Sequence, residues 1–528
     1  MLHPTLIRNR HIGPAIYFLA ATIAFTACNS QKAGNTKKVT THRQVINAEL
    51  PDPSVIEVNG TYYATGSTND WGSVYPLYKS TDLVNWTFIN YIFKQPPSWT
   101  ISSYWAPELL FHNGTYYCFY TARRNDGVSC IGVATAKNME EGFTDHGQLL
   151  EWGNEAIDAF VFNENGKLYL TWKAYGLTKG KTIQILGAEL SEDGLSVKGE
   201  AFEMLTAERN SWEAGGMEGQ CIVQHNGYLY MLYSGNSCCG GQCDYQVGVA
   251  RAKSIKGPWE KYEQNPILKG NNVWKCPGHG TAVQTKDSWY YLYHAYNEKG
   301  FPYLGRSAML GEILWNEKSG WPYFDTTARI DGSQIKQDLV EKFDTDSLGR
   351  WWKYDVPGYK FNASVAGGRL NLTETGRKNS VGAAVCVSPD YADFTMSATI
   401  AGKNAALKGL VLYATGSNSV GLGVKNDSLI LWKVKDNRFI ELNTLHVAYN
   451  DQLHLKADIV DGHLGKYYYS SDGTNWTLVT NKADNQESIN GDNLAWWSWG
   501  VKAGLFVKAD SISGNNTATF DDFGITYK

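Results

Sequence analysis

A nine-residue pattern, a polar turn followed by aromatic and β-branched residues, recurs along the first part of the chain. Four copies align without gaps and a weaker fifth follows them: 59-NGTYYATGS-67, 113-NGTYYCFYT-121, 165-NGKLYLTWK-173, 226-NGYLYMLYS-234 and 287-DSWYYLYHA-295. Asn-Gly is the strongest short signal for a two-residue hairpin turn, and strand-like runs such as 54-SVIEV-58 precede the turns. Each copy therefore predicts two antiparallel strands joined by a tight turn.

The spacing of the copies predicts a ring of repeated units. Their starts lie 54, 52, 61 and 61 residues apart, and further strand-like runs, 129-SCIGVATA-136 and 245-YQVGVARA-252, fall between them. Four strands per period are typical of a propeller blade. We therefore expect an all-β protein whose residues 45–335 form a five-bladed β-propeller. A solenoid, or a sandwich with coincidental turns, is the alternative that five copies in register disfavour.

A second β domain is expected after 331-DGSQIKQ-337, where the period stops. Short alternating runs follow, among them 394-FTMSATI-400, 409-GLVLYAT-415 and 429-LILWKV-434. Alternation of this kind predicts half-buried strands, and residues 338–528 are interpreted as a jelly-roll-like β-sandwich. The aromatic run 494-LAWWSWG-500 is either a sugar platform or part of the core, and whether the domain binds carbohydrate stays open.

The first residues have the pattern of a secretory signal. In 8-RNRHIGPAIYFLAATIAFTACNS-30 a cationic stretch precedes an apolar run of about fifteen residues, too short to span a bilayer. Phe25-Thr26-Ala27-Cys28 resembles a lipobox, so residues 1–27 are interpreted as a lipoprotein signal peptide, Cys28 as the lipidated residue and 28–44 as a flexible tether. An ordinary cleaved signal or an uncleaved anchor is the alternative. We expect an exported bacterial outer-membrane lipoprotein, periplasmic or on the cell surface.

Charge and composition limit the classes of molecule that the protein is expected to bind. Without residues 1–27 the chain has 46 basic and 52 acidic residues, a net charge near −6, and no basic patch that suggests nucleic acid. Aromatic residues make up 13% of the chain, with 19 Trp and 32 Tyr. This balance suits a neutral ring-shaped ligand such as a sugar, although aromatic residues also favour strands. The expected partner is an oligo- or polysaccharide, with membrane contact only through the lipid anchor.

Cysteines cluster in 237-SCCGGQC-243, and Cys276 lies farther along the chain. In an oxidising compartment this set is expected to hold a disulfide, and the neighbours Cys238 and Cys239 can also bond to each other. The connectivity stays open. Zinc is disfavoured, because the spacing lacks two CxxC halves.

Three acids share a place relative to the turns. Asp52 and Asp158 lie seven residues before their Asn-Gly pairs and Glu218 lies eight before its pair, which predicts the start of the innermost strand in blades 1, 3 and 4. Trp105 and His279 occupy the corresponding places in blades 2 and 5. Inner strands are normally apolar, so these polar residues predict a site at one mouth of the channel.

Carboxylates gathered at a channel mouth suit cleavage of a glycosidic bond. One carboxyl must be protonated to help the leaving oxygen depart, and another must be ionised to draw a proton from water. A third acid nearby raises the pKa of its neighbour. Singly, each acid is more often a solvated loop charge. Glu213, thirteen residues before its turn, is expected to be a loop or rim charge, and Glu108 a structural partner of Arg123 or Arg124.

At these residues the sequence resembles glycoside hydrolase family 43, over about residues 45–335. The motifs that carry the resemblance are 50-LPDPSVIEVNGTYYATGS-67, 104-YWAPEL-109, 156-AIDAFVF-162, 216-GMEGQ-220 followed by 226-NGYLYMLYSG-235, 277-PGHG-280 and 305-GR-306. The resemblance implies that Asp52 is the general base, that Asp158 tunes the pKa of the acid and orients it, and that Glu218 is the general acid. One departure is Gln220, where the family usually has proline after Glu-Gly.

The resemblance also implies further site residues. Trp105, Trp71 and Arg306 are expected to bind sugar, although Arg306 can instead hold an acid or form an interstrand ion pair. His279 matches a histidine that in several members binds calcium or another ion in the channel, and a hydrogen-bonded core histidine is the alternative. No cofactor is expected to be required. In the second domain, Phe343-Asp344, 467-YYYSSDGTNWTLV-479 and 520-FDDF-523 resemble a concanavalin-like β-sandwich.

The function expected from these residues is that of an inverting exo-glycosidase acting on side chains of plant-type polysaccharides. The insertion 235-GNSCCGGQCDYQ-246 is expected to wall off the mouth, which favours a pocket and removal of terminal sugars. α-L-Arabinofuranosidase is the first choice, and β-D-xylosidase or a galactan-active exo-β-galactosidase of the same family is the alternative. An alternative of another class is an inactive carbohydrate-binding lipoprotein. A protein-interaction propeller would have an apolar hub, which the polar residues above contradict.

Overall fold

The computed structural model describes residues 42–325, 336–358, 360–376, 379–511 and 516–528. The predicted signal peptide, Cys28 and most of the predicted tether lie outside these residues and stay predictions. In the described part the only helix is the short 3-10 segment η1 (Asp492–Leu494), which confirms the all-β class. No helix of this part is long and apolar enough to cross a membrane.

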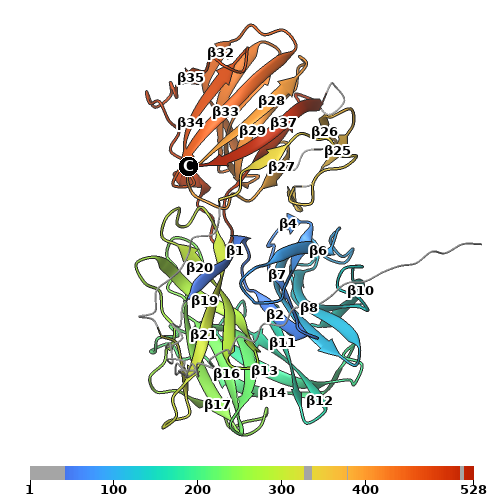
Figure 1. Cartoon of the computed structure of the whole chain (residues 1–528), viewed down its shortest axis with the longest axis vertical. Coiled ribbons are helices and arrows are strands. Elements are labelled where there is room, and N and C mark those ends of the chain that lie inside the picture. The colour runs from blue at the N-terminus through green and yellow to red at the C-terminus, as the bar shows by residue number, and fades with distance from the viewer. Residues whose placement is uncertain (1–41, 326–335, 359, 377–378, 512–515) are drawn as a thin grey trace, which may run out of the picture. The chain divides into compact units, whose positions relative to one another are not determined.

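Within the described residues the first part of the chain forms five antiparallel sheets, the blades, coloured blue to yellow-green in Figure 1. Blade 1 consists of β2 (Ser54–Val58), β3 (Thr61–Thr65), β5 (Val74–Ser80) and β6 (Thr87–Phe93). Blade 2 consists of β7 (Ser102–His112), β8 (Thr115–Arg123), β9 (Ser129–Ala136) and β10 (Thr144–Leu150). Blade 3 consists of β11 (Ala156–Glu164), β12 (Lys167–Ala174), β13 (Gln184–Leu190) and β14 (Val197–Thr206). Blade 4 consists of β15 (Met217–His225), β16 (Tyr228–Gly235), β17 (Gln246–Ala252) and β18 (Glu260–Lys261).

The turns that define the repeat have the conformation that the sequence predicts. Both residues of each Asn-Gly pair have positive φ, from 52° and 80° at Asn59 and Gly60 to 46° and 73° at Asn226 and Gly227. This is the type I′ conformation that matches the twist of two paired strands, and asparagine and glycine reach it at low cost. The first two strands of blades 1 to 4 therefore pair as hairpins across these turns.

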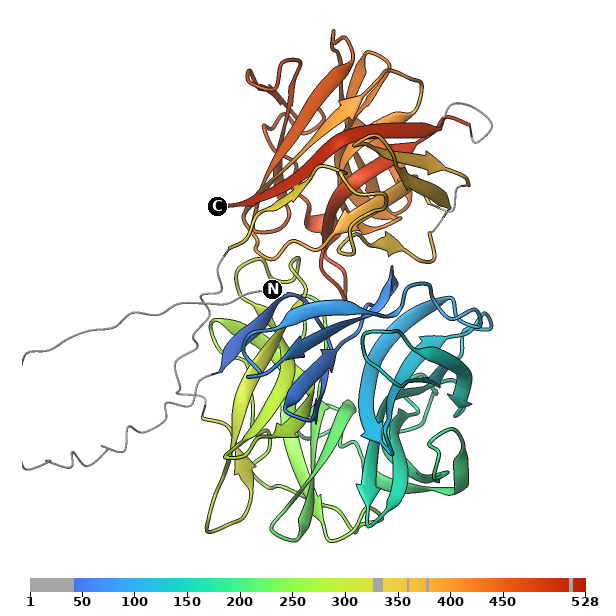
Figure 2. The same cartoon turned by 45° about the vertical axis from the view of Figure 1, so that its right-hand side comes forward.

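Blade 5 joins the two ends of the propeller. It contains β19 (Trp274–Gln284), β20 (Trp289–Asn297), β21 (Arg306–Trp315) and the short β22 (Pro322–Tyr323), and its outermost strand is β1 (Arg43–Glu49) from the start of the domain. Figure 2 shows dark blue β1 beside the yellow-green strands of this blade. The inner strands β2, β7, β11, β15 and β19 contact one another in cyclic order. The propeller thus begins at Arg43, two residues before the predicted boundary.

The second part of the chain is a sandwich of two sheets, coloured yellow to red in Figure 1. In sheet order, one contains β25 (Phe361–Val365), β26 (Leu370–Glu374), β37 (Thr517–Tyr527), β28 (Phe394–Ala401), β33 (Gln452–Val460), β34 (Leu464–Ser470) and β35 (Thr477–Val479), with β23 (Leu339–Glu341) paired to β37. The other contains β27 (Ala383–Val387), β36 (Lys502–Lys508), β29 (Leu407–Thr415), β30 (Asn418–Lys425), β31 (Ser428–Lys435) and β32 (Arg438–His446). Alternate apolar side chains from both sheets form one buried core.

Specific contacts join the propeller to the sandwich. The two-residue strand β4 (Trp71–Gly72) of blade 1 pairs with β24 (Tyr354–Asp355). At the end of β1, the Glu49 carboxylate accepts hydrogen bonds from the ammonium of Lys502 in β36 and, at 2.8 Å, from the backbone N–H of Gly500. The side chains of Lys502 and Glu49 are only 1% and 5% exposed. A buried ion pair therefore links the two domains.

Replacing Lys502 by methionine is expected to destabilise the protein strongly. The change leaves the Glu49 carboxylate buried without its cation, which costs about 3–5 kcal/mol of unfolding free energy. The double variant Lys502→Met/Glu49→Leu should recover much of this loss. Urea unfolding measures both. Lys466→Met, which removes an exposed pair with Glu487, is the matched control and should change little. Equal, small effects of Lys502→Met and Lys466→Met would contradict the role of the buried pair.

Candidate active site

Each inner strand has a residue with positive φ, which lies within the strand in blades 2 to 5 and two residues before it in blade 1: Asp52 (51°), Ala106 (36°), Asp158 (58°), Gly219 (61°) and His279 (37°). In blades 2 to 5 the pairing register shifts at the same place. Such a bulge bends the strand and redirects the side chains beside it. The repeat therefore turns polar side chains of several blades towards one site, as the sequence predicts.

The bulges correct one detail of the predicted register. In blade 4 the positive-φ position belongs to Gly219 and not to Glu218. Glu218 lies one residue before the positive-φ position of its blade, as Trp105 does in blade 2. Asp52 and Asp158 occupy the positive-φ position itself in their blades. The prediction that all three acids share one position was wrong by this residue. The offsets of seven and eight residues before the turns already contained the difference.

A second ring of side chains holds these positions in place. The ninth residue of each Asn-Gly repeat, at or just beyond the end of the second strand of its blade, bonds to the next inner strand at or beside its positive-φ residue. Thr121 Oγ1 accepts from the Asp158 N–H at 3.1 Å, and Ser234 Oγ accepts from the His279 N–H at 2.8 Å. Ser67 Oγ accepts from the Ala106 N–H at 2.7 Å and donates to Asp52 Oδ2 at 2.5 Å.

The ring continues through the remaining two blades. In blade 3 the ninth residue is Lys173, whose Nζ lies 2.8 Å from Glu218 Oε2. In the weaker fifth copy the bond comes from the eighth residue, because His294 Nδ1 accepts from the Asp52 N–H at 3.0 Å. Sequence reasoning missed these five residues as site residues. Their common place at the end of the repeat is the signal that could have found them.

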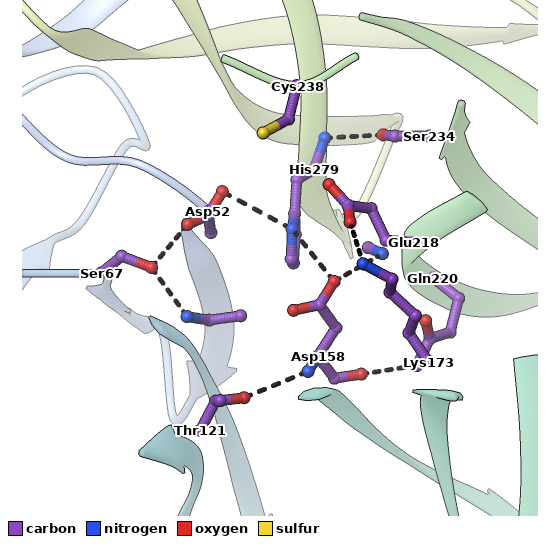
Figure 3. A network of polar contacts seen from close by, with 12 residues as sticks. Asp52, Ser67, Thr121, Asp158, Lys173, Glu218, Gln220, Ser234, Cys238 and His279 are labelled. Carbon is purple, nitrogen blue, oxygen red and sulfur yellow. Dashed lines mark hydrogen bonds and ion pairs between the residues drawn. The ribbon is translucent and has the colours of Figure 1, made fainter. Parts of the chain in front are cut away.

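The Asp52 carboxylate accepts a hydrogen bond from Ser67 and faces the His279 ring, as Figure 3 shows, and Arg306 and His294 also lie beside it. Arg306 Nη1 lies 2.9 Å from its Oδ1, and His294 Nδ1 and His279 Nδ1 lie 3.2 and 3.5 Å from the same atom. Burial opposes ionisation of Asp52, but Arg306 and His279 outweigh it and hold its pKa well below the ordinary value. Asp52 is therefore ionised at neutral pH.

Asp158 and Glu218 are neighbouring acids with opposite pKa shifts. Burial raises the pKa of Asp158 to about 7, and the Glu218 carboxylate adds to this rise. Burial also disfavours ionised Glu218, but the Lys173 ammonium outweighs it and lowers the pKa of Glu218. Tyr245 additionally donates its hydroxyl to Glu218 Oε1 at 2.9 Å. Of the two, Asp158 therefore keeps its proton to the higher pH, and below about pH 7 the unliganded pair holds one proton, on Asp158.

Gln220, the residue at which the chain departs from the family pattern, has a positioning role. Its side-chain amide donates to the Asp158 carbonyl at 2.6 Å and to Thr171 Oγ1 at 3.1 Å. The Asp158 carboxylate itself accepts from the Gly219 N–H at 3.1 Å. Asp158 is thus held from blade 4 at both its backbone and its side chain.

The loop 494–500 of the sandwich reaches this site. Arg306, 3% exposed, donates through Nη2 to the carbonyl of Ser498 at 3.0 Å while Nη1 holds Asp52. The preceding residue of the loop, Trp497, is 49% exposed, and its ring lies 6.1 Å from that of Trp105, edge to face. The run 494–500 was expected to be either a sugar platform or part of the core. The exposed place of Trp497 beside the site fits the first alternative. Arg306 holds an acid, one of the roles expected for it.

Three expectations about single residues are corrected. Trp71, expected to bind sugar, is 3% exposed and packs edge to face on Tyr413 of the sandwich. Glu213, expected to be a loop or rim charge, is 1% exposed, because Tyr233 and Lys261 from β16 and β18 bind its carboxylate at 2.8 and 2.9 Å. Glu108 bonds to Thr281 and has no ion pair with Arg123 or Arg124; burial raises its pKa to about 8.

The residues around His279 do not form a metal site. Its Nδ1 faces Asp52 at 3.5 Å and Asp158 at 3.8 Å, and the Arg306 guanidinium already neutralises Asp52. Across the described ranges no group of three or more His, Cys, Asp or Glu side chains could hold a metal ion. The His279 ring contacts the Asp52 and Asp158 carboxylates at ion-pair distance, and the backbone N–H of His279 donates to Ser234 Oγ.

The model of "Glycosyl hydrolases family 43" matches residues 41–322, more than half of the chain. The chain belongs to this family. Its members are inverting enzymes that act on O-glycosyl bonds, so this family 43 chain is a glycoside hydrolase. A second model, "Beta xylosidase C-terminal Concanavalin A-like domain", matches residues 391–526 and confirms the class of the second domain.

Relatives of this family 43 chain have several activities. It is 28% identical over 307 residues to an extracellular endo-alpha-(1->5)-L-arabinanase of Bacillus subtilis, covering 53% of this chain and 88% of that protein. It is 26% identical over 339 residues to a non-reducing end alpha-L-arabinofuranosidase of Bacteroides ovatus, covering 59% of this chain and 60% of that protein. It is 24% identical over 318 residues to a xylan 1,3-beta-xylosidase of a Vibrio species, covering 54% and 58%.

Solved structures of the family share the whole two-domain fold. A xylan beta-1,4-xylosidase from Bacillus halodurans superposes with a TM-score of 0.78 at 20% identity, covering 91% of this chain and 99% of that one. A Bacteroides ovatus family 43 protein from a xyloglucan utilisation locus gives 0.77 at 20% identity, covering 92% and 100%. At such identity the likeness shows the fold alone.

Replacing Lys173 by methionine is expected to move the basic limb of the pH–activity profile to higher pH by about one unit. The Lys173 ammonium favours the charged forms of both Glu218 and Asp158, so its removal raises both pKa values. The proton needed for acid catalysis is then retained to higher pH. Profiles of kcat/KM on an aryl glycoside measure the shift.

The matched control is Lys167→Met on the same strand, where the ammonium is exposed and pairs with Glu189. Its profile should equal that of the wild type. A basic limb that stays in place in Lys173→Met, or moves to lower pH, would contradict the electrostatic role of Lys173.

Proposed function

We propose that this glycoside hydrolase is an exo-acting α-L-arabinofuranosidase that releases terminal sugars from side chains of plant-type polysaccharides. The observation that carries the catalytic part is the pKa pattern of the three acids. Asp52 is ionised, whereas Asp158, beside Glu218, has a pKa raised to about 7 and holds a proton below that pH. Inverting cleavage needs one ionised and one protonated carboxyl.

In this mechanism Asp52 is the general base and removes a proton from the water that attacks the anomeric carbon. Arg306 and Ser67 donate to the Asp52 carboxylate and hold it in place for this step. Glu218 is the general acid and protonates the leaving oxygen. Asp158 makes and breaks no bond to the substrate. Because two neighbouring carboxylates repel each other when both are ionised, Asp158 beside Glu218 helps the pair to keep its proton.

Glu218 must carry the proton when the substrate is bound, although the unliganded site favours Asp158. Lys173 must then release the Glu218 carboxylate. Glu155 offers the ammonium another partner, because its Oε1 lies 3.9 Å from Lys173 Nζ and its buried Oε2 has no hydrogen bond in the described residues. Lys173 can therefore exchange between two carboxylates as the proton moves to Glu218.

The exo mode rests on the rim of the site. Two segments outside the propeller repeat reach it, the sandwich loop with Trp497 and the blade 4 loop 236–245. They also meet each other, because a Cβ on Gly240 would lie 3.1 Å from Trp497 Cα. Walls on these sides favour entry of a chain end over passage of a whole chain.

The sugar is proposed from the relatives. The B. subtilis and B. ovatus proteins are named for arabinan and for non-reducing end arabinofuranosides. β-D-Xylosidase is the second candidate, because the second domain matches a family model described for beta xylosidases.

The general acid can be identified by its dependence on the leaving group. Glu218→Gln should lower kcat/KM roughly a hundredfold to ten-thousandfold on an unactivated arabinofuranoside, and far less on the dinitrophenyl glycoside, whose leaving group needs no proton. Asp52→Asn should lower both rates alike, because water must be deprotonated in both reactions.

Glu263→Gln, at an exposed carboxylate of the same blade, is the control and should match the wild type. Equal losses on the two substrates would contradict Glu218 as the acid. A wild-type protein that binds sugar but cleaves no aryl glycoside would instead be the inactive binding protein considered above.

The sugar and the exo mode can be tested together with natural substrates. From branched arabinan and arabinoxylan we expect free arabinose as the first product, without oligosaccharides, and inversion of the anomeric centre by proton NMR. Early release of arabino-oligosaccharides would contradict the exo mode. Xylose from xylo-oligosaccharides, without arabinose, would favour the second candidate.

A further inference from the structure

The blade 4 loop after β16 contains a disulfide between the neighbouring residues Cys238 and Cys239. A disulfide stabilises a fold mainly by closing a loop of the unfolded chain, and its effect grows with the length of that loop. A bond between residues one apart closes no such loop. The global stability of the protein therefore does not explain this bond, and its place beside the catalytic acids suggests a local role.

The loop is held firmly at its other residues. A second disulfide joins Cys243 to Cys276, three residues before His279. The Asp244 N–H donates to the Ser237 carbonyl at 3.0 Å, and the Gly240 N–H donates to the Tyr296 hydroxyl at 3.2 Å. These contacts fix both sides of the Cys238–Cys239 ring and hold it in one place.

The ring lies beside groups that contact the acids. Cys238 packs against the cluster of Tyr245, Cys276 and Tyr296, and Tyr245 donates its hydroxyl to Glu218. Figure 3 shows Cys238 on the same side as His279, with its sulfur turned towards the side of Asp52. Both cysteines are partly exposed, in contrast to the buried free cysteines Cys118, Cys130, Cys221 and Cys386.

The ring is also continuous with the aromatic rim. Gly240, the residue after Cys239, contacts the backbone of Trp497, and Trp497 contacts Trp105. An apolar arc of Trp105, Trp497 and the disulfide therefore borders the polar floor formed by Asp52, Asp158 and Glu218. Sugars present an apolar face of C–H groups besides their hydroxyls, and polarisable, uncharged surfaces suit that face.

We propose that the Cys238–Cys239 disulfide is part of the substrate-binding site and packs against the C–H face of the terminal pentose ring. It takes the place that an aromatic side chain commonly has, in a smaller and more rigid form. The proposal rests on the proposed function, because it needs a sugar in this site. It assigns the disulfide to binding and leaves proton transfer to the acids.

The test is the double variant Cys238→Ala/Cys239→Ala, which removes the ring and leaves the Cys243–Cys276 anchor. We expect KM for the aryl arabinofuranoside to rise about tenfold, with a smaller change in kcat. The inhibition constant of free arabinose should rise by a similar factor, and the pH profile should stay that of the wild type. The thermal midpoint should also stay near the wild-type value.

Dithiothreitol gives a second, independent measurement. It reduces the disulfide to two thiols and is itself oxidised to its cyclic disulfide. Treated wild type should approach the KM of the double variant, whereas treatment of the double variant reports only the Cys243–Cys276 bond. If the alanine pair fails to fold, Cys238→Ser/Cys239→Ser and the treated wild type decide the question.

A KM and an arabinose inhibition constant within about twofold of the wild type, in a folded double variant, would overturn the proposal. A rise in KM with an unchanged inhibition constant would also overturn it, because the ring would then not contact the terminal sugar. Failure of the proposed function is distinguishable, since in that case the wild type itself would show neither hydrolysis nor inhibition.

Discussion

The bond from the second strand of each blade to the first strand of the next is the interaction on which the site depends. Ser67, Thr121, Lys173, Ser234 and His294 make these bonds in the five described blades. Each inner strand has, within it or just before it, a residue in a left-handed conformation, which is costly for residues other than glycine. Bonds from the neighbouring blade satisfy its polar groups and maintain that conformation. The acids are therefore positioned between blades, and no single blade could place one alone.

Lys173 shows how one exception in this ring changes the chemistry. In three blades the equivalent residue is a hydroxyl, which bonds to the strand without adding charge. In blade 3 it is an ammonium beside Glu218, and Glu155 lies on its other side. The charge fixes which carboxyl keeps the shared proton in the empty site. The repeat position that holds the strand in other blades therefore lowers the pKa of Glu218 in the site through Lys173 of blade 3.

Much of this arrangement is predictable from the repeat, because the turn chemistry of Asn-Gly sets both the hairpins and the count from each turn to its acid. The offsets of seven and eight residues already separate Glu218 from Asp52 and Asp158, but the positive φ of Gly219 itself is seen only in the backbone. Glu213 and Trp71 were misjudged for another reason. Their partners Lys261 and Tyr413 lie far along the chain, and no local sequence pattern predicts such contacts.

Arg306 binds a catalytic carboxylate with one nitrogen and a carbonyl of the sandwich domain with another. The catalytic unit of this enzyme is consequently the whole two-domain chain, and the boundary between the domains runs through the active site. A sandwich of this kind is not an exchangeable module that could be moved to another propeller. Its loop 494–500 and the Arg306 position must change together, so the two domains are expected to diverge as one lineage.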